Sequence, residues 1–265
     1  MHTQHHPKLQ AGGFTLLELI GVMAVMAILA GALAPSVMRL IEEGFQGAEQ
    51  QSMETLGVAL GDYILATQSI PASGDWVDAV SSYAALAPDT VRLNQKKKTR
   101  RIYYDPHFFT GSDTAFSGYT QTQGLATRPV SPRIMIVSDL NGEISANLNT
   151  AALFNAVWDQ SATSTITESK SLIITRLNLN NRFKRALLSN AASVQASFQL
   201  EGNAAGAIGA AVAGIDGTRE VFVIHGTRLR LNATPYPSGA TLRQLIVNQD
   251  VSLRYSFDGS TWSWI

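Results

Sequence analysis

Residues 12–34 read GGFTLLELIGVMAVMAILAGALA, and they set the architecture of the amino-terminal part of the chain. The apolar segment within them, 14–34, has 21 residues. As a helix it would be about 31 Å long at about 1.5 Å per residue, which matches a hydrocarbon core about 30 Å thick. Lys8 lies before the segment, and Arg39 is the first basic residue after it. The preference for positive charge on the inner side therefore predicts a single-pass anchor with a cytoplasmic amino terminus.

Two ordinary interpretations compete for this segment. A secretory signal peptide usually has an apolar region of about 7–15 residues with its cleavage site after it. Here the region is longer, and a cut at Ala34-Pro35 would place a proline after the scissile bond, which is unfavourable. A plain transmembrane anchor fits the length. Neither explains Glu18, the only ionisable residue of the span, because a carboxylate within the membrane costs roughly 2.5–3.5 kcal/mol.

Glu18 therefore needs a partner, and we expect none within its own span. Cleavage after Gly13 would create an α-amino group on Phe14, four residues before the carboxylate. In an assembly, that amine could pair with Glu18 of a neighbouring subunit. A well-satisfied ion pair in low dielectric would then fix the register of the two subunits.

The stretch 13–20, GFTLLELI, follows a short polar leader and resembles the cleavage and methylation motif of type IV pilins and type II secretion pseudopilins. The motif is specific, although it covers a small part of the chain. The resemblance implies cleavage after Gly13 by a prepilin peptidase, N-methylation of Phe14, and a role for Glu18 in incorporation into a filament. It implies an inner-membrane location. It also implies three kinds of partner: the prepilin peptidase, other pilin or pseudopilin subunits in a homo- or hetero-polymer, and an inner-membrane assembly platform.

A helical pattern continues beyond Pro35, where pilin helices often leave the membrane and where a proline would kink the axis by removing one hydrogen bond. The apolar residues up to about Thr67 form one stripe of an amphipathic helix: Val37, Leu40, Ile41, Phe45, Ala48, Met53, Leu56, Leu60 and Ile64. The polar residues assigned to the other faces are Glu42, Glu43, Gln46, Glu49, Gln50 and Glu54. We expect one long helix, bent or interrupted at Pro35, that ends before Ser69-Ile70-Pro71; two separate helices are the alternative.

The rest of the chain predicts an α+β head with a largely antiparallel sheet, because a helix comes first and strands follow. Helices are expected at 75–86 and 149–158, and strands at 101–104, 134–137, 172–177, 220–231 and 250–255. Tight turns are expected at Asn141-Gly142 and Asp258-Gly259, and loops at 110–130 and 201–218. A long helix laid on a carboxy-terminal sheet is also the plan that the resemblance implies.

These expectations divide the chain into four parts: a prepilin leader at 1–13, a transmembrane half-helix at 14–34, a periplasmic amphipathic half-helix at 35–68 and a soluble head at 69–265. The head would lie in the periplasm or in a surface filament. It is large for a major pilin, which favours a minor pilin or a pseudopilin.

Composition excludes several classes of function. The chain has no cysteine, so disulfides, thiol catalysis and cysteine-based zinc sites are ruled out. Basic and acidic residues number 20 each, so the net charge favours neither nucleic acid nor an acidic partner. The sequence contains no phosphate-binding loop, dinucleotide fingerprint or G-x-S-x-G motif. We expect a protein that is not an enzyme and has no cofactor.

One dense charge run stands out in the head: Lys96, Lys97, Lys98, Arg100 and Arg101. It could bind DNA, because each lysine or arginine contact to a phosphate releases counterions. Some minor pilins bind DNA. No aromatic platform or second basic run lies beside it in sequence, which favours a solvated hairpin loop between strands. A minor pilin whose head binds DNA or a secreted substrate is the alternative to a purely structural subunit.

Asp139, Asn141 and Glu143 form a D-x-N-x-E arrangement whose oxygens could bind calcium, as some pseudopilin heads do. The Asn141-Gly142 turn already explains the asparagine, and the set of ligands is short. We therefore predict no metal site.

Overall fold

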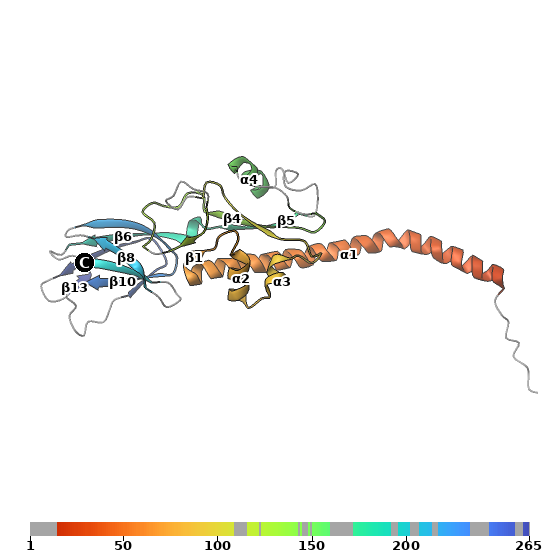
Figure 1. Ribbon diagram of the computed structural model, residues 1–265, viewed down its shortest axis with the longest axis horizontal. Coiled ribbons are helices and arrows are strands. Elements are labelled where there is room, and N and C mark those ends of the chain that lie inside the picture. The colour runs from red at the N-terminus through yellow and green to blue at the C-terminus, as the bar shows by residue number, and fades with distance from the viewer. Residues whose placement is uncertain are drawn as a thin grey trace, which may run out of the picture. The chain divides into compact units, whose positions relative to one another are not determined.

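The computed structural model describes residues 15–108, 116–121, 123–142, 144, 148, 150–159, 172–191, 196–201, 207–213, 217–233, 244–257 and 262–264. The chain divides into two compact units, Met1–Gly47 and Ala48–Ile265. The second unit has an α+β architecture, with most of its helices in the first part of its sequence and mostly antiparallel strands (Figure 1).

The first helix, α1 (Leu16–Thr67), is a single element of 52 residues. The prediction of one long helix is confirmed, and the alternative of two separate helices is wrong. α1 ends where the sequence predicts, because Gln68 takes a left-handed conformation with a φ of 54° and the short strand β1 (Ser69–Ile70) follows. A residue with positive φ just after the last turn is a common way to end a helix.

A three-layer core occupies the start of the second unit. The antiparallel strands β2 (Arg101–Tyr104), β4 (Arg133–Asp139) and β5 (Leu172–Asn178) form a sheet in the order β2-β4-β5. Ile134 and Ile136 belong to the cluster that contains the α1 side chains, whereas Met135 and Val137 belong to the cluster of α4 (Ala151–Trp158). β4 therefore reads as an unbroken apolar run because both of its faces are covered.

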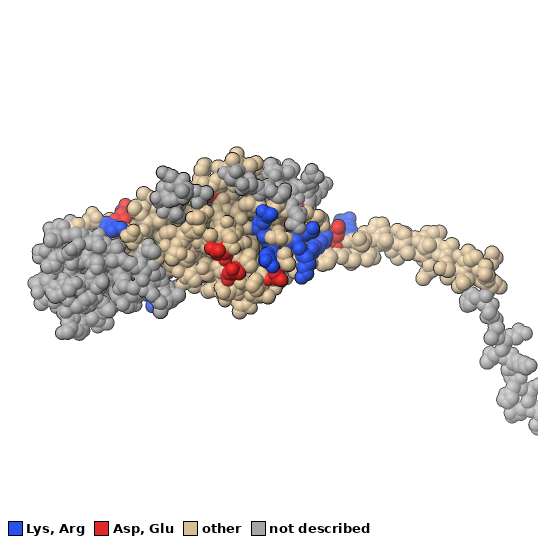
Figure 2. All heavy atoms as spheres, viewed as in Figure 1, with Lys and Arg blue, Asp and Glu red and all other residues tan. Residues whose placement is uncertain are grey.

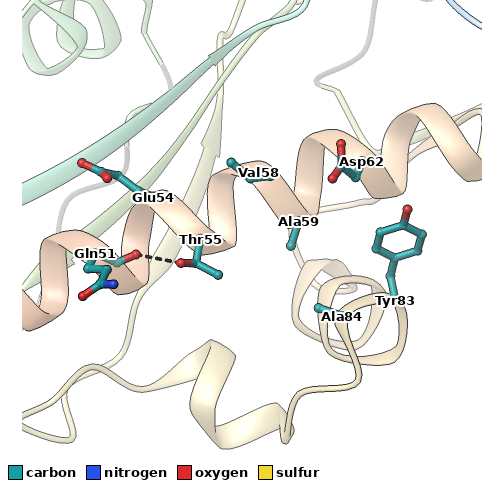
Figure 3. Close-up of a pocket in the computed structure, with 8 residues that line it drawn as sticks. All are labelled: Gln51, Glu54, Thr55, Val58, Ala59, Asp62, Tyr83 and Ala84. Atoms are coloured by element: carbon teal, nitrogen blue, oxygen red, sulfur yellow. Dashed lines mark hydrogen bonds between the residues drawn. The ribbon is translucent and has the colours of Figure 1, made fainter.

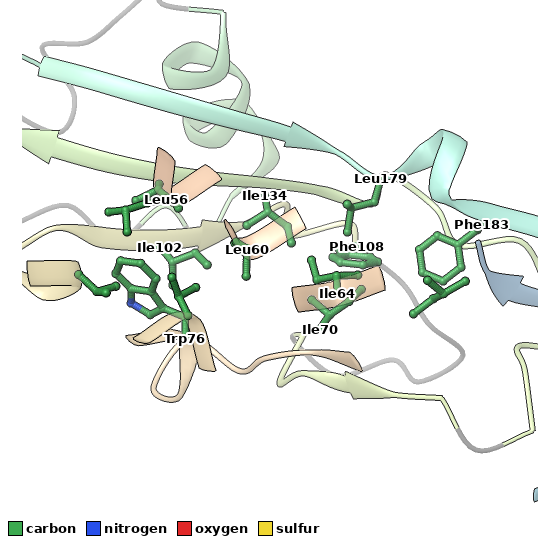
Figure 4. Close-up of a cluster of buried hydrophobic side chains, with 14 of the residues drawn as sticks. Leu56, Leu60, Ile64, Ile70, Trp76, Ile102, Phe108, Ile134, Leu179 and Phe183 are labelled. Atoms are coloured by element: carbon green, nitrogen blue, oxygen red, sulfur yellow. The ribbon is translucent and has the colours of Figure 1, made fainter. Parts of the chain in front are cut away.

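The second half of α1 supplies the apolar ridge of this core. Leu56, Leu60 and Ile64 point into a cluster that also takes in Trp76 of α2 (Trp76–Ala84) and residues of β2 and β4 (Figure 4). Val91 of α3 (Pro88–Arg92) belongs to the same cluster. α1 comes very close to β5 at Gly57, where a Cβ atom would lie 2.4 Å from Cγ2 of Thr175. Glycine is therefore favoured at this crossing, since any side chain would have to displace the Thr175 methyl group.

The carboxy-terminal part is a sandwich of two four-stranded sheets, in the orders β11-β10-β7-β8 and β13-β12-β6-β9. The strands are β6 (Phe183–Asn190), β7 (Ala196–Glu201), β8 (Ala207–Ala213), β9 (Thr218–Ile224), β10 (Thr227–Ala233), β11 (Gln244–Val247), β12 (Val251–Phe257) and β13 (Trp262–Trp264). Leu188, Val223 and Leu253 of one sheet share a buried cluster with Leu200 and Leu229 of the other. Only the β6–β12 pair is parallel among the strand pairs of the described residues.

A buried polar network joins the end of α1 to this sandwich. The side chain of Gln121, which follows β3 (Tyr119–Thr120), donates to the Thr227 hydroxyl at 2.8 Å and accepts from the Ile224 amide at 2.8 Å. The side-chain amide of Gln68 donates through Nε2 to the carbonyl oxygens of Leu65 and His225, at 2.6 and 3.2 Å. These side chains satisfy backbone groups that would otherwise be buried without a partner.

The sequence predicts most elements of the three-layer core correctly and those of the sandwich poorly. The helices at 76–84 and 151–158 and the strands of the small sheet lie within a few residues of their expected positions. The run 220–231 is two strands rather than one, because Gly226 turns the chain with a φ of 87°, and the strands on either side of it belong to different sheets. The expected loop at 201–218 contains β8, whose alanine-rich sequence carries little strand signal. Asn141 and Gly142 lie in a bend after β4, and the turn predicted at 258–259 lies outside the described residues.

Candidate functional site: the amino-terminal helix and its anchoring to the head

The predicted processing site borders the described part of the chain. Gly13 and Phe14 lie outside the described residues, so their roles stay predictions. Thr15 is the first described residue, and α1 begins directly after it at Leu16. Glu18 lies in the first turn of the helix.

Glu18 and Thr15 form a capping box at the start of α1. The Thr15 amide donates to Glu18 Oε2 at 2.9 Å, and the Glu18 amide donates to the Thr15 hydroxyl at 3.3 Å. This reciprocal pair satisfies two of the amide groups that the first turn of a helix leaves without partners. The expectation that Glu18 has no partner within its own span is therefore wrong. The missed signal was the spacing T-x-x-E itself, which predicts a capping box from sequence.

The capping box leaves part of the carboxylate available. Thr15 contacts Oε2 through both its amide and its hydroxyl, at 2.9 and 3.0 Å, so Oε1 can accept from a further donor. An ionised carboxylate has room for about four hydrogen bonds. Capping and pairing with a second subunit are thus compatible roles for the same side chain.

The first half of α1 exposes its apolar side chains on all sides. Among the residues that the structure describes, α1 is the one helix long and apolar enough to cross a membrane. Leu17, Ile28 and Leu40 are exposed by 81%, 72% and 69%. A helix that is apolar all round requires an apolar surrounding, either lipid or other helices. This chain provides no such cover for residues 16–41 within its described part.

Pro35 lies inside α1, and the helix continues through it. A proline at this position leaves the carbonyl oxygen of Gly31 without its usual helical amide donor. The adjacent Ser36 hydroxyl donates to the Leu33 carbonyl oxygen at 2.7 Å, which adds a local hydrogen bond in the same turn. The predicted interruption at Pro35 is absent, and a bend there stays a prediction.

The apolar stripe predicted beyond Pro35 is buried only in its second half. Val37, Leu40 and Ile41 are exposed, whereas Met53 and Ile64 are fully buried. Glu49 is also fully buried, which corrects its assignment to a polar face. Its position carried a signal, because it lies four residues after Phe45 and four before Met53 and so continues the stripe.

Arg100 is the partner of Glu49. Its Nε and Nη2 atoms donate to the two carboxylate oxygens at 2.7 Å each, and the two side chains are 1% and 0% exposed. The remaining N–H groups donate to the carbonyl oxygens of Thr90 and Val91 and to the Ser52 hydroxyl, at 2.6, 3.0 and 3.1 Å. All five donors of the guanidinium are therefore used. This ion pair anchors α1 to the segment between α3 and β2.

The burial of Arg100 corrects its inclusion among the DNA-binding candidates, since a buried, fully bonded guanidinium cannot contact a phosphate. Lys97 and Arg101 are exposed, and Lys96 and Lys98 are half-buried. The run lies in a turn between α3 and β2, and an antiparallel bridge between Leu93 and Thr99 closes it. It therefore resembles the predicted hairpin loop, except that a helix precedes it. DNA binding by the remaining residues stays a prediction.

The calcium candidates are engaged in the local structure. Asp139 is fully buried, and its Oδ1 accepts from the Asn141 amide at 2.9 Å. Oδ1 of Asn141 accepts from the Lys96 ammonium at 2.7 Å, which places a positive charge where a cation would bind. Glu143 lies outside the described residues. Among the residues that are described, no three histidine, aspartate or glutamate side chains cluster as a metal site would require.

A shallow groove of about 460 Å³ follows the solvent-facing side of α1 within the second unit (Figure 3). Val58, Ala59 and Tyr83 form its apolar part, with Glu54 and Asp62 along its edge. Val58 is 64% exposed, so the solvent-facing side of α1 carries an apolar residue that the rest of the described chain does not cover. The groove offers a contact surface of mixed character rather than an arrangement suited to acid–base catalysis.

No model of a known protein family and no curated protein matches this chain. The assignment of function therefore depends on the motif at 13–20 and on the geometry of α1 described above.

Proposed function

We propose that this chain is a pilin-like structural subunit, a minor pilin or pseudopilin, that is cleaved after Gly13 and assembled into a type IV pilus or a type II secretion pseudopilus. One observation supports the proposal: the motif at 13–20 overlaps the start of a helix whose first half is apolar on every side and not covered by the rest of the described chain. An ordinary anchor needs neither the motif nor a carboxylate in its first turn.

The two halves of α1 suit two environments. Before assembly, the apolar half can lie in the inner membrane, with the head on the periplasmic side. After assembly, it can pack against the helices of other subunits. The other half is held in the head by Met53, Leu56, Leu60 and Ile64 and by the Glu49–Arg100 pair. A force on the anchor is thus transmitted to the head through a packed helix.

The first test of this proposal is the chemical identity of the mature amino terminus. Mass spectrometry of the membrane-extracted protein is expected to find a chain that begins at Phe14 and carries one methyl group. Replacing Gly13 by a bulky residue should block the cut and leave the leader in place. A mature chain that keeps Met1, or one that starts after residue 34, would contradict the proposal.

The second test separates the two roles of Glu18. Glu18→Gln keeps an oxygen that can accept from the Thr15 amide and so preserves the capping box, but it removes the charge. Glu18→Ala removes both. If the charge pairs with the amino group of Phe14 in a second subunit, both variants are expected to be processed and to enter filaments at least tenfold less than wild type, a loss of about 1.4 kcal/mol or more.

Thr15→Ala is the matched control, because it weakens the cap and leaves the carboxylate charged. It is expected to be incorporated far better than either Glu18 variant. Normal incorporation of Glu18→Gln would refute the ion pair and leave capping as the role of this residue. The readout is the fraction of each processed subunit in sheared or crosslinked filaments.

A further inference from the structure

The basic turn between α3 and β2 has an ordered framework. Asn94 is 3% exposed, and its Oδ1 accepts from the amides of Lys96 and Lys98, at 3.0 and 2.9 Å. Its side-chain amide donates to the Asp139 carbonyl oxygen at 2.7 Å, which ties the turn to the end of β4. The Lys97 amide donates to the Asn94 carbonyl oxygen at 2.9 Å and closes the turn. A single buried asparagine thus holds three consecutive lysines in place.

Lys97 adopts a conformation that disfavours lysine. Its φ is 62°, in the left-handed region where glycine and asparagine are preferred. Holding a residue other than glycine there strains the backbone and often marks a functional position. The side chain is exposed, so burial of its stem in the core does not account for the choice. A glycine at this position would fit the backbone conformation better, but it would lack the positive charge that Lys97 places at the tip of the turn.

The same turn places a set of basic side chains on one part of the surface. Figure 2 shows lysine and arginine side chains gathered in one region of the described face. Lys97 and Arg101 are exposed, and Lys98 is half-buried. Successive side chains along an extended segment point to opposite sides. Because Arg100 points inward to Glu49, the side chain of Arg101 in β2 points outward.

The covalent chain keeps this turn close to the membrane. Arg100 is bonded to Glu49, which follows Ala34, the last residue of the apolar segment, by 15 residues along α1. Fifteen residues of helix rise by about 22 Å, and the headgroup layer extends about 5–8 Å beyond the hydrocarbon core. Glu49 therefore lies no more than about 17 Å of helix from the lipid surface. A tilt of about 20°, which is usual for membrane helices, lowers the height of Glu49 above the lipid surface by roughly a further 1 Å.

We propose that the basic turn, through Lys97 and Lys98 together with Arg101, binds the anionic phospholipid headgroups of the membrane that holds α1. The inference rests on the part of the proposed function that places α1 in a membrane. Basic residues next to an anionic leaflet each favour the bound state by about fivefold. Because α1 links the turn to the membrane, the lipid surface is present at high effective concentration, whereas DNA would have to bind from solution. The expected consequence is that the head rests on an anionic membrane before the subunit is assembled.

The test uses the full chain, reconstituted into vesicles of phosphatidylcholine alone or of phosphatidylcholine mixed with phosphatidylglycerol. The sequence has no cysteine, so Gln95→Cys gives a single labelling site in the turn without changing its charge. Energy transfer from a dye at this site to a dye on lipid headgroups is expected to be higher in the anionic vesicles. The increase should disappear at about 1 M salt, where the Debye length falls to about 3 Å.

Two variants that each remove three positive charges make the test specific. Replacing Lys97, Lys98 and Arg101 by glutamine is expected to abolish the increase in energy transfer, since about a hundredfold or more of preference for the bound state is lost. The matched control replaces three basic residues of the sandwich, Lys184, Arg219 and Arg254, by glutamine and should retain the increase. An equal loss in both variants would overturn the proposal, because it would show a general charge effect.

Lys97→Gly separates lipid binding from folding. It relieves the left-handed conformation, so the melting temperature is expected to rise by about 1–4 °C while the energy transfer in anionic vesicles falls. A fall in both quantities would indicate a structural role for Lys97 and would count against the proposal.

Equal energy transfer in the two kinds of vesicle overturns the proposal. So does saturable, salt-sensitive binding of duplex DNA to the chain in phosphatidylcholine vesicles, if the triple variant of the turn abolishes it, because the turn is then a nucleic-acid site. Flotation with phosphatidylcholine vesicles after a carbonate wash tests the anchor by itself. Failure to float defeats the proposed function, whereas flotation without any dependence on lipid charge defeats only this inference.

Discussion

Arg100→Ala is expected to lower the free energy of unfolding of the second unit by about 3–5 kcal/mol. The guanidinium is almost completely buried and uses all of its donors, two of them on the carboxylate of Glu49. Removing it leaves that carboxylate buried without a counter-charge and leaves the carbonyl oxygens of Thr90 and Val91 without their donors. The loss would be a large part of the total, since most domains are stable by only about 5–15 kcal/mol.

This prediction is measured as a shift in melting temperature. A loss of this size corresponds to a fall of about 6–20 °C for a unit of this length. Arg101→Ala is the matched control, because its side chain is exposed and such changes usually stay within about 0.5 kcal/mol. Replacing Glu49 and Arg100 together by methionine should cost less than Arg100→Ala alone, since no charge is then buried. If Arg100→Ala and Arg101→Ala have the same melting temperature, the Glu49–Arg100 ion pair does not anchor α1.

The second large effect is expected from shortening the chain. A fragment that begins at Ala48 keeps the whole second unit and is expected to fold cooperatively. A fragment that begins at Ile70 loses the four fully or almost fully buried side chains of α1, Met53, Leu56, Leu60 and Ile64. Their burial contributes together about 6–12 kcal/mol, which is comparable to the stability of a whole domain. The shorter fragment also leaves Arg100 buried without Glu49. We expect it to aggregate or remain unfolded.

Circular dichroism and dispersion of amide resonances distinguish the two fragments. The longer one should give a sharp thermal transition, and the shorter one should give none. A cooperative transition in the fragment from Ile70 would mean that the sheets are stable without α1 and that the helix is only an accessory to the head. Tests of ligand binding by the head therefore need a fragment that starts near Ala48.

Several features of the fold could be predicted because their signal is local. The apolar run of β4 and the helical period from Met53 to Ile64 each follow from repeats within one element. The end of α1 follows from Ser69-Ile70-Pro71 in the same way. The sandwich was less predictable, because β8 consists mainly of alanine and glycine and becomes a strand through pairing with β7.

The candidate site shows the same division. The predicted cleavage motif, the apolar span and the single carboxylate in it are properties of neighbouring residues, so the sequence by itself determined them. The buried state of Glu49 and Arg100 depends on two residues 51 positions apart. Glutamate and arginine are residue types usually found on the surface, and only the tertiary structure decided that these two meet in the interior. The physical reason is that burial of a charge is favourable only when its partner is delivered by another element, and no periodicity within one helix or one strand encodes that meeting.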